Sequence, residues 1–186
     1  AQWGADESLR RAATSYGQVQ LGFVHHTVSS NSYTASQVPA MIRGIYAYHV
    51  QAEGWNDIGY NFLIDRFGQT WEGRYGGMDK AVVGAQTLNS NAWSTGFSAI
   101  GNFDVAAVPQ AMTDAFKRIF AWKLSLSGIP ATGTVFANDK YFQRISGHRD
   151  GFQTACPGRY LYAKMDEIRA GAAALIGAQP RSTACT

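Results

Sequence analysis

The sequence predicts an α/β fold in which a central mixed β-sheet is flanked by three main helices, with helices on both faces of the sheet. Short apolar runs rich in β-branched and aromatic residues alternate with longer segments in which apolar residues recur every three or four positions. Three of the longer segments reach helix length, and no internal repeat or low-complexity linker separates them. Strands and hairpins that alternate with helices indicate helices packed on a sheet.

A chain of 186 residues fits one domain, and 46% hydrophobic with 16% charged residues is enough for a full core. We expect an N-terminal arm over residues 1–18, anchored on the body by Trp3. The main domain is expected over residues 19–177, followed by a C-terminal tail over residues 178–186.

The main domain begins with a buried strand over residues 19–26, where Val, Leu and Phe favour the pleated state. Residues 34–37 have the spacing of a capping box and start a helix that Gly54 ends. A strand over residues 60–65 then turns into a second strand over residues 70–74.

The middle of the chain predicts two further strands, over residues 81–84 and 97–103. Between them, residues 86–96 are rich in Asn and Ser, which favours a surface loop bordering a cleft. The second long helix begins at Pro109 and is ended by Gly128.

The last third of the chain combines a hairpin or long loop over residues 131–143 with a short strand over residues 144–148. That strand is expected to deliver His148. A third helix follows residues 157–158 and runs to about Ile176, with its leucine, isoleucine and methionine side chains inward.

The charge pattern excludes some partners. A net charge of +3 favours a polyanion such as a cell-wall polymer or a nucleic acid. No run of lysine and arginine is present, so we expect no nucleic-acid partner. No apolar stretch approaches a membrane span, and the sequence begins without the regions of a signal peptide, as a mature secreted chain would.

Two histidines and a cysteine from distant segments form the candidate metal site. His25 ends the first apolar run, and His148 and Cys156 stand eight positions apart near the other end of the chain. Imidazole and thiolate are preferred zinc ligands, and three protein ligands leave a fourth position for water. No Cys-x-x-Cys pair is present, and ligands from distant segments are typical of catalytic zinc. We therefore interpret His25, His148 and Cys156 as ligands of a catalytic Zn²⁺.

Neighbouring residues leave alternatives open. His25 and His26 are adjacent, so on a strand they point to opposite faces, and the one that misses the site is by default a structural histidine. His49 falls on the buried face of the first helix, where a structural role is favoured over metal binding. Tyr60 is a candidate donor to an oxyanion, and Thr154 a candidate partner of a zinc-bound water. A core tyrosine and an ordinary loop hydroxyl are the alternatives.

The two cysteines are compatible with a Cys156–Cys185 disulfide, with one zinc ligand and a spare thiol, or with two free thiols. Oxidising compartments favour the disulfide, whereas the surroundings of Cys156 favour a ligand. No carboxylate stands out as a general base, because Asp57 can cap a turn and Glu72 can be a surface charge.

Several motifs then carry a resemblance to a known family. They are HHT at 25–27, GWNDIGYNF at 54–62, EGR at 72–74, VGA at 83–85, IGNF at 100–103, GHRD at 147–150 and CPG at 156–158. In this order they resemble peptidoglycan recognition proteins, which belong with the type 2 N-acetylmuramoyl-L-alanine amidases. The resemblance extends over residues 23–176.

The resemblance implies a zinc ion at the base of a substrate groove in the main domain. It implies hydrolysis of the amide between N-acetylmuramic acid and the L-alanine of the stem peptide. Peptidoglycan is then the partner, and the protein is expected to be secreted, associated with the cell wall and monomeric. Position by position, the resemblance matches His25, His148 and Cys156 to the zinc ligands, Tyr60 to the catalytic tyrosine and Thr154 to the residue beside the metal.

The resemblance also places His49, Asn61, Arg74 and Asn91 as candidate substrate-binding residues of the groove. Gln86 stands where relatives usually carry histidine, and it is expected near the groove, where it would affect stem-peptide preference more than catalysis.

Family members that lack the cysteine ligand bind peptidoglycan without cutting it, so the presence of Cys156 favours an enzyme. The alternative is a non-catalytic peptidoglycan-binding module in which Cys156 is tied to Cys185 and no zinc is held.

Overall fold

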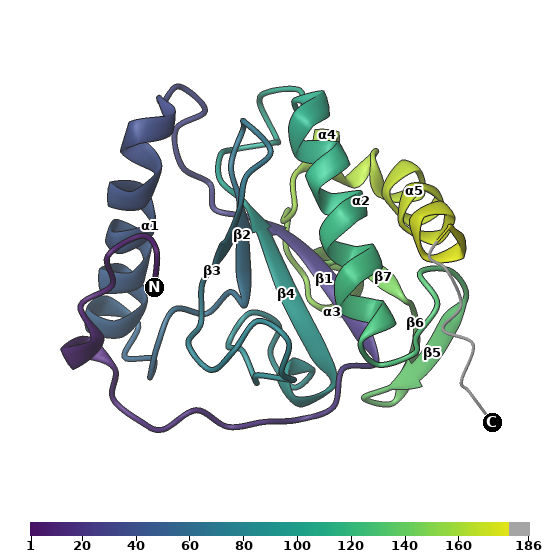
Figure 1. Ribbon diagram of the computed structural model, residues 1–186, viewed down its shortest axis with the longest axis horizontal. Helices are drawn as coiled ribbons and strands as arrows, with labels where there is room; N and C mark the ends of the chain where they lie inside the picture. The colour runs from purple at the N-terminus through teal and green to yellow at the C-terminus, as the bar shows by residue number, and fades with distance from the viewer. Residues whose placement is uncertain (179–186) are drawn as a thin grey trace.

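A five-stranded sheet forms the centre of the protein, whose computed structural model describes residues 1–178 (Figure 1). Its strands are β1 Leu21–His26, β2 Phe62–Ile64, β3 Thr70–Glu72, β4 Ser94–Ala99 and β7 Ile145–Gly147. They lie in the order β3-β2-β4-β1-β7. β1 pairs in parallel with β4 and β7, β2 pairs in parallel with β4, and β3 is antiparallel to β2. The predicted mixed α/β fold is confirmed.

Three main helices flank this sheet, as the sequence predicts. They are α1 Val38–Ala47, α2 Gln110–Ser125 and α5 Met165–Gly177. Figure 1 shows α1 on the left of the sheet and α2 and α5 on the right. The shorter elements are η1 Glu7–Leu9, η2 Ala35–Gln37, η3 Tyr48–Ala52, η4 Asn91–Trp93, α3 His148–Gly151, α4 Arg159–Tyr162 and a hairpin of β5 Thr134–Ala137 and β6 Lys140–Gln143.

The helices α1 and α2 begin where the sequence predicts. The Thr34 backbone N–H donates a hydrogen bond to Gln37 Oε1 at 2.8 Å, which is half of the expected capping box. Pro109 occupies the N-cap of α2, where its missing N–H costs nothing. Within residues 1–178, no helix is both long and apolar enough to cross a membrane.

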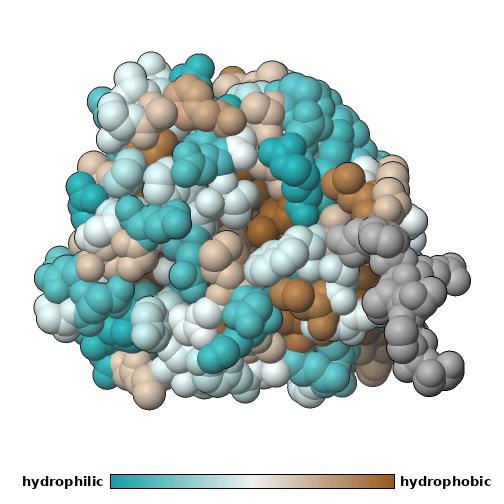
Figure 2. Space-filling model, in the orientation of Figure 1, coloured by the Kyte–Doolittle hydropathy of each residue, from teal (hydrophilic) through white to brown (hydrophobic). Residues whose placement is uncertain are grey.

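One face of the sheet packs against α2 and α5 through a single apolar cluster, and we call it the apolar face. Its members include Val24, Phe62, Ile64, Phe97, Phe116, Phe120, Leu124, Ile145 and Ile168. The close approach of α2 depends on a glycine in β1, because a Cβ on Gly22 would lie 2.3 Å from a ring carbon of Phe120. Hydrophilic residues gather on the outer surface over α2 (Figure 2).

The opposite face has two separate apolar clusters with polar residues between them, and we call it the divided face. One cluster lies under α1 and contains Val38, Ile42, Tyr46, Ile58, Leu63 and Trp71. The other, beside the hairpin, contains Leu21, Phe23, Ala137 and Phe142. The paired strands show how polar residues separate the clusters. Leu63 of β2, which belongs to the cluster under α1, lies beside Ser98 of β4, and Ser98 lies beside His25 of β1. All three are buried.

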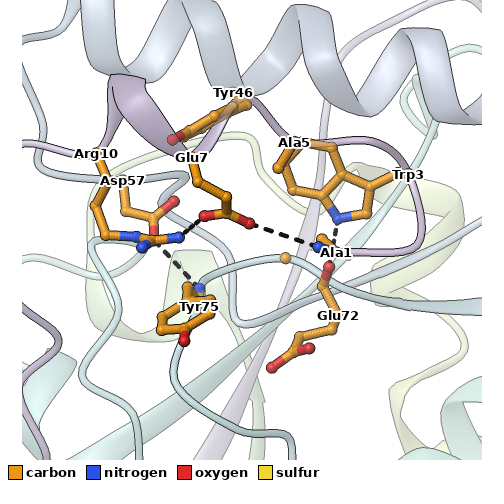
Figure 3. A pocket seen from close by; sticks show the side chains of 10 residues that line it. Ala1, Trp3, Ala5, Glu7, Arg10, Tyr46, Asp57, Glu72 and Tyr75 are labelled. Atoms are coloured by element: carbon orange, nitrogen blue, oxygen red, sulfur yellow. Dashed lines mark hydrogen bonds and ion pairs between the residues drawn. The ribbon is translucent and has the colours of Figure 1, made fainter.

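The expected N-terminal arm packs on the divided face beside α1 (Figure 3). The Trp3 indole N–H donates to the Glu72 backbone carbonyl at 2.6 Å, and the Trp3 side chain is buried. Arg10 Nε donates to Asp57 Oδ2 at 3.2 Å, and the Arg10 guanidinium lies 3.9 Å from the centre of the Tyr75 ring. The residues that make these contacts line a small cavity of about 70 Å³. The carboxylate of Asp57 is therefore engaged in holding the arm.

Three predicted elements differ in the structure. Residues 81–84 form no sheet strand, and Val82 makes an isolated bridge to Tyr16 of the arm. The strand expected over residues 97–103 starts and ends earlier, as β4. The third helix is divided into α4 and α5, although no Gly or Pro separates them to mark the break. Residues 179–186, which hold Cys185 and nearly all of the expected tail, lie outside the described residues.

Candidate metal centre

His25 enters the centre from the end of β1, on the divided face. Its side chain is buried, and its ring is held from behind, because Nε2 lies 2.6 Å from Gln86 Oε1. The other ring nitrogen, Nδ1, lies 3.7 Å from Cys156 Sγ. The neighbouring His26 points to the opposite face, where its Nδ1 accepts a hydrogen bond from the Phe103 N–H at 3.1 Å. The prediction that one of the two adjacent histidines is structural is thereby confirmed.

His148 is the first residue of α3, immediately after β7. The Gly147 N–H donates to Asp150 Oδ2 at 2.8 Å, and the Tyr162 hydroxyl donates to Asp150 Oδ1 at 2.7 Å. These two bonds fix the start of α3 and hold the His148 ring 4.5 Å, centre to centre, from the His25 ring.

Cys156 follows α3 in a loop that folds back on itself. The Arg149 N–H donates to the Cys156 carbonyl at 3.0 Å, which fixes the loop against α3. The His26 backbone N–H donates to Cys156 Sγ at 3.4 Å and orients the sulfur. The strand that supplies one candidate ligand thus also positions another.

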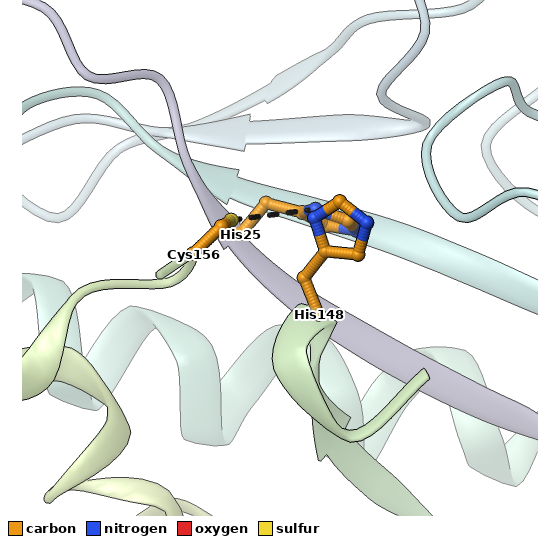
Figure 4. A group of neighbouring side chains, drawn as sticks. All are labelled: His25, His148 and Cys156. Atoms are coloured by element: carbon orange, nitrogen blue, oxygen red, sulfur yellow. Dashed lines mark hydrogen bonds between the residues drawn. The ribbon is translucent and has the colours of Figure 1, made fainter. Parts of the chain in front are cut away.

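The ligand atoms of His25, His148 and Cys156 all lie within 4.8 Å of one another (Figure 4). Donors about 2.0–2.3 Å from a tetrahedral ion lie roughly 3.5 Å apart, so the spacing suits one ion with little adjustment. Two imidazoles and a sulfur are the donor types that Zn²⁺ prefers. The residues present therefore fit a zinc ion.

The electrostatics of the centre agree with that fit. Burial, with a smaller effect from His148, holds the pKa of His25 well below its usual range. Burial likewise lowers the pKa of His148 to about 4, so both rings are neutral near pH 7 and each keeps a lone pair for a cation. Burial raises the pKa of the Cys156 thiol to about 12. A divalent cation would offset this by stabilising the thiolate.

Tyr60 connects the centre to a hollow along α1. Its ring centre lies 5.5 Å from that of His25 and 5.4 Å from that of His49. Burial raises the pKa of Tyr60 well above its usual value, so its hydroxyl stays neutral. The hollow has a volume of about 410 Å³. Its lining includes Thr27, Ser29, Met41, Ile45, Tyr48, His49 and Tyr60.

The other predicted site residues differ in how far they reach this hollow. Thr154 Oγ1 accepts the Cys156 N–H at 3.2 Å, which places its hydroxyl beside the candidate ligand. Asn61 is buried, and its amide binds the Val82 carbonyl and the Gly96 N–H, both at 2.8 Å.

Arg74 and Asn91 are also engaged by the protein itself. The half-buried Arg74 donates from Nη1 to the Ile58 carbonyl at 3.3 Å. Asn91 Oδ1 accepts the backbone N–H groups of Gln86 and Thr87, both at 2.9 Å. For Asn61, Arg74 and Asn91 these contacts support the loops around the centre, and a role in binding substrate stays a prediction.

The sequence predicts Gln86 near the substrate groove, and the structure places it in contact with the candidate ligand His25, so an effect on stem-peptide preference stays a prediction. The Gln86 side chain is only 6% exposed and lies behind His25, in contact with Nε2. The sequence singled the position out only as a departure from the family pattern. A second contact that the sequence did not reveal is Phe152, whose ring stacks 5.7 Å from that of His148 and is 48% exposed.

An α/β sheet that carries a His, His, Cys cluster beside a tyrosine-lined hollow defines the class of a protein with a candidate metal site suited to Zn²⁺. Comparison with known proteins then gives the family. Residues 15–159 match the model of the family described as N-acetylmuramoyl-L-alanine amidase. The chain belongs to this family of N-acetylmuramoyl-L-alanine amidases and peptidoglycan recognition proteins, as its motifs predict.

Individual relatives agree. Peptidoglycan-recognition protein SC2 of Drosophila simulans is 30% identical over 169 residues, covering 91% of this chain and 82% of the relative. The human N-acetylmuramoyl-L-alanine amidase is 33% identical over 165 residues, covering 87% of this chain and 26% of that longer protein. The crystal structure of peptidoglycan recognition protein-LE in complex with tracheal cytotoxin superimposes with a TM-score of 0.73 at 28% identity, covering 89% of each chain.

Proposed function

We propose that the protein is a zinc-dependent N-acetylmuramoyl-L-alanine amidase. It hydrolyses the amide between the lactyl group of N-acetylmuramic acid and the L-alanine of the stem peptide in peptidoglycan. One water is consumed, and the products are a lactyl carboxylate and a free L-alanine amino group. The observation that carries the proposal is the convergence of the His25, His148 and Cys156 ligand atoms within 4.8 Å.

The role of each residue follows from its position. Bound Zn²⁺ supplies a Lewis acid that polarises the amide carbonyl and lowers the pKa of water. His25, His148 and Cys156 would hold the ion. The neutral Tyr60 hydroxyl donates a hydrogen bond to the oxygen that becomes negative during attack. Thr154 Oγ1 already accepts the Cys156 N–H, so its own proton remains available to orient the attacking water.

The hollow along α1 supports peptidoglycan as the substrate. It reaches Tyr60 directly, so a stem peptide lying along α1 would bring its first amide to the centre. Peptidoglycan recognition protein-LE, in the structure compared above, binds tracheal cytotoxin, which is a monomeric diaminopimelic acid-type peptidoglycan. A ligand of this chemistry suits the hollow of the present chain. Location outside the cell, at the wall, and a monomeric state belong to the same proposal.

The test is the release of free amino termini from purified peptidoglycan, with and without a chelator. We expect release that stops on chelation and returns on addition of Zn²⁺. Cys156→Ser should abolish both zinc binding and release, while Cys185→Ser should retain both. Release that resists chelation would contradict the zinc mechanism.

The alternative is a protein that binds peptidoglycan without hydrolysing it. The presence of non-catalytic members in the family favours this alternative. It requires Cys156 to be withdrawn from the metal centre, for example by pairing with Cys185. Counting reactive thiols in denaturant separates the two functions. Two thiols with one zinc per chain support the amidase, whereas no thiols and no zinc support the binder.

A further inference from the structure

The buried side chain of Gln86 lies in a chain of hydrogen bonds that runs from a backbone carbonyl to His25. Ser94 Oγ donates to the Ser90 carbonyl at 2.7 Å. Gln86 Nε2 donates to Ser94 Oγ at 2.9 Å, and Gln86 Oε1 lies 2.6 Å from His25 Nε2. The Thr87 hydroxyl donates to the same Gln86 Oε1 at 2.6 Å. All five residues are buried, so water does not compete for these groups.

The direction of every bond in this chain follows from its first member. A backbone carbonyl has no proton and can only accept, so the Ser94 hydroxyl must donate to Ser90. Ser94 Oγ is then left to accept, and the only group of the Gln86 side chain able to donate is its NH₂. The amide oxygen of Gln86 therefore faces His25. An amide oxygen can only accept, so His25 Nε2 must carry the ring proton.

Fixing the proton on Nε2 has a consequence for the opposite side of the ring. In a neutral imidazole one nitrogen carries the proton and the other keeps a lone pair. With the proton on Nε2, the lone pair of His25 is on Nδ1, the atom that lies 3.7 Å from Cys156 Sγ. The nitrogen free to bind a cation is thus the one that faces the other candidate ligands.

The surrounding backbone is shaped to keep Gln86 in this place. Asn91 Oδ1 accepts the Gln86 backbone N–H and fixes the start of the loop. Gly96 of β4 lies directly beneath the side chain, and a Cβ there would be 2.3 Å from Gln86 Cγ. Because a side chain at position 96 would occupy the same space, the glycine is what allows Gln86 to reach His25.

We propose that Gln86 is a positioning residue that holds His25 with its proton on Nε2 and its Nδ1 lone pair directed at the metal centre. The chain from Ser90 through Ser94 fixes the orientation of the Gln86 amide. The ion that Nδ1 binds is taken from the proposed function, whereas the tautomer does not depend on it. Partners of this kind typically change metal affinity by about tenfold to a hundredfold when they are removed.

The first experiment is ¹⁵N imidazole spectroscopy of the metal-free wild-type chain, in which a histidine with its proton on Nε2 is distinguished from one with its proton on Nδ1. We expect a single Nε2–H form for His25 near pH 7. A mixture, or the Nδ1–H form, overturns the proposal without recourse to any variant.

The second experiment compares three variants by zinc affinity, measured by competition with a chelator. Gln86→Met keeps the length of the side chain and removes the acceptor, so we expect a mixed tautomer and zinc affinity lowered by about tenfold to a hundredfold. Gln86→Glu keeps an acceptor for Nε2–H and should retain the single tautomer. Thr95→Val is the matched control. Thr95 lies in β4 beside Ser94, and its buried hydroxyl has no hydrogen-bond partner among the described residues. This variant should leave both readouts unchanged.

The outcomes separate this proposal from the proposed function. A single Nε2–H form in a chain that binds no zinc supports the positioning role of Gln86 and contradicts the amidase. Tight zinc binding by Gln86→Met, within twofold of wild type and with an unchanged tautomer, contradicts the positioning role and leaves the amidase intact.

Discussion

The two faces of the sheet are built from the same strands, yet they are organised differently. The apolar face joins α2 and α5 to the sheet through one continuous cluster. The divided face breaks its apolar surface into a cluster under α1 and a cluster beside the hairpin, with His25 and Ser98 between them. Because side chains on a strand alternate, β1 contributes Val24 to the first face and His25 to the second. One face therefore stabilises the fold, and the other accommodates the buried polar groups of the candidate metal centre.

The strongest test of this division is a cavity in the apolar face. Phe120 of α2 is fully buried and lies 4.3 Å, centre to centre, from the Phe97 ring. Phe120→Ala should lower the free energy of unfolding by about 3–5 kcal/mol, since contacts are lost and a cavity remains. Zinc affinity, measured well below the new melting temperature, should be unchanged. The measurements are urea unfolding and chelator competition.

A matched control for Phe120 is Phe136 of β5, which is 57% exposed. Phe136→Ala should change the free energy of unfolding by less than about 0.5 kcal/mol. If Phe120→Ala weakened zinc binding while fully folded, the two faces would be coupled and the division would be wrong.

The next test concerns catalysis on the divided face. Tyr60→Phe should lower turnover of peptidoglycan by about 10²–10³-fold, because one hydrogen-bond donor to the developing oxyanion is lost. Zinc content should remain at the wild-type level. The check is the release of free amino termini together with metal analysis, and unchanged turnover would remove Tyr60 from the mechanism.

Tyr33 provides the structural counterpart of Tyr60. Its hydroxyl donates to the Ile100 carbonyl at 2.9 Å and accepts the Arg66 N–H at 2.8 Å. Tyr33→Phe should lower the free energy of unfolding by about 1–3 kcal/mol, because the buried Ile100 carbonyl and the partly buried Arg66 N–H lose their partner. Turnover of the folded variant should match that of the wild type.

A smaller effect on stability and zinc binding is expected at Gly96 of β4, which leaves space for the Gln86 side chain. Gly96→Ala introduces a Cβ that would lie 2.3 Å from Gln86 Cγ, so the side chain must move. We expect a loss of about 1–3 kcal/mol in the free energy of unfolding, with weaker zinc binding. Gly177→Ala is the control, because a Cβ there meets no atom within 4 Å among the described residues. Equal stability of both variants would contradict the packing argument.

The smallest effect is a pH dependence at the edge of the apolar face. Lys123 of α2 is buried, and its ammonium donates to the Met78 and Lys80 carbonyls at 2.6 and 2.7 Å. Burial lowers the pKa of Lys123 to about 8, from 10.5 when exposed. Between these values the unfolded chain binds more protons, so the contribution of Lys123 to stability rises with pH.

The measurement for Lys123 is the free energy of unfolding of wild type and Lys123→Met at several pH values. The difference should shift in favour of the wild type from pH 8 towards pH 10, by at most about 1.4 kcal/mol per pH unit. Below pH 8 the difference should be constant. A difference that is constant throughout would contradict the lowered pKa.

The sequence predicts elements well where periodicity is long or where several apolar residues run together. β1 and α2 appear where the pattern places them, because β1 is a short apolar run that is buried throughout and the buried positions of α2 repeat with the helix period. Residues 81–84 have strand propensity but bridge only to the arm at Tyr16, since propensity does not specify a pairing partner. The break between α4 and α5 depends on packing and has no local signal in the sequence.

The candidate site divides in the same way. His25, His148 and Cys156 can be predicted from ligand chemistry, and the structure brings the three together. The place of Gln86 depends on the pairing of β1 with β4 and on how the loop after residue 85 folds over it. Neither the strand pairing nor the loop conformation can be predicted from the local sequence. The sequence therefore marks Gln86 as unusual but does not predict its contact with His25.

The pairing of β1 has one further consequence, for the newly made chain. β1 lies between β4 and β7, and both partners come later in the sequence, β7 by more than a hundred residues. As the polypeptide leaves the ribosome, one edge of β1 stays unpaired until β4 has emerged, and the other edge stays unpaired until β7 has emerged, when most of the chain has been made. Exposed strand edges promote aggregation. We therefore expect this protein to depend on chaperones during synthesis and to refold best at high dilution.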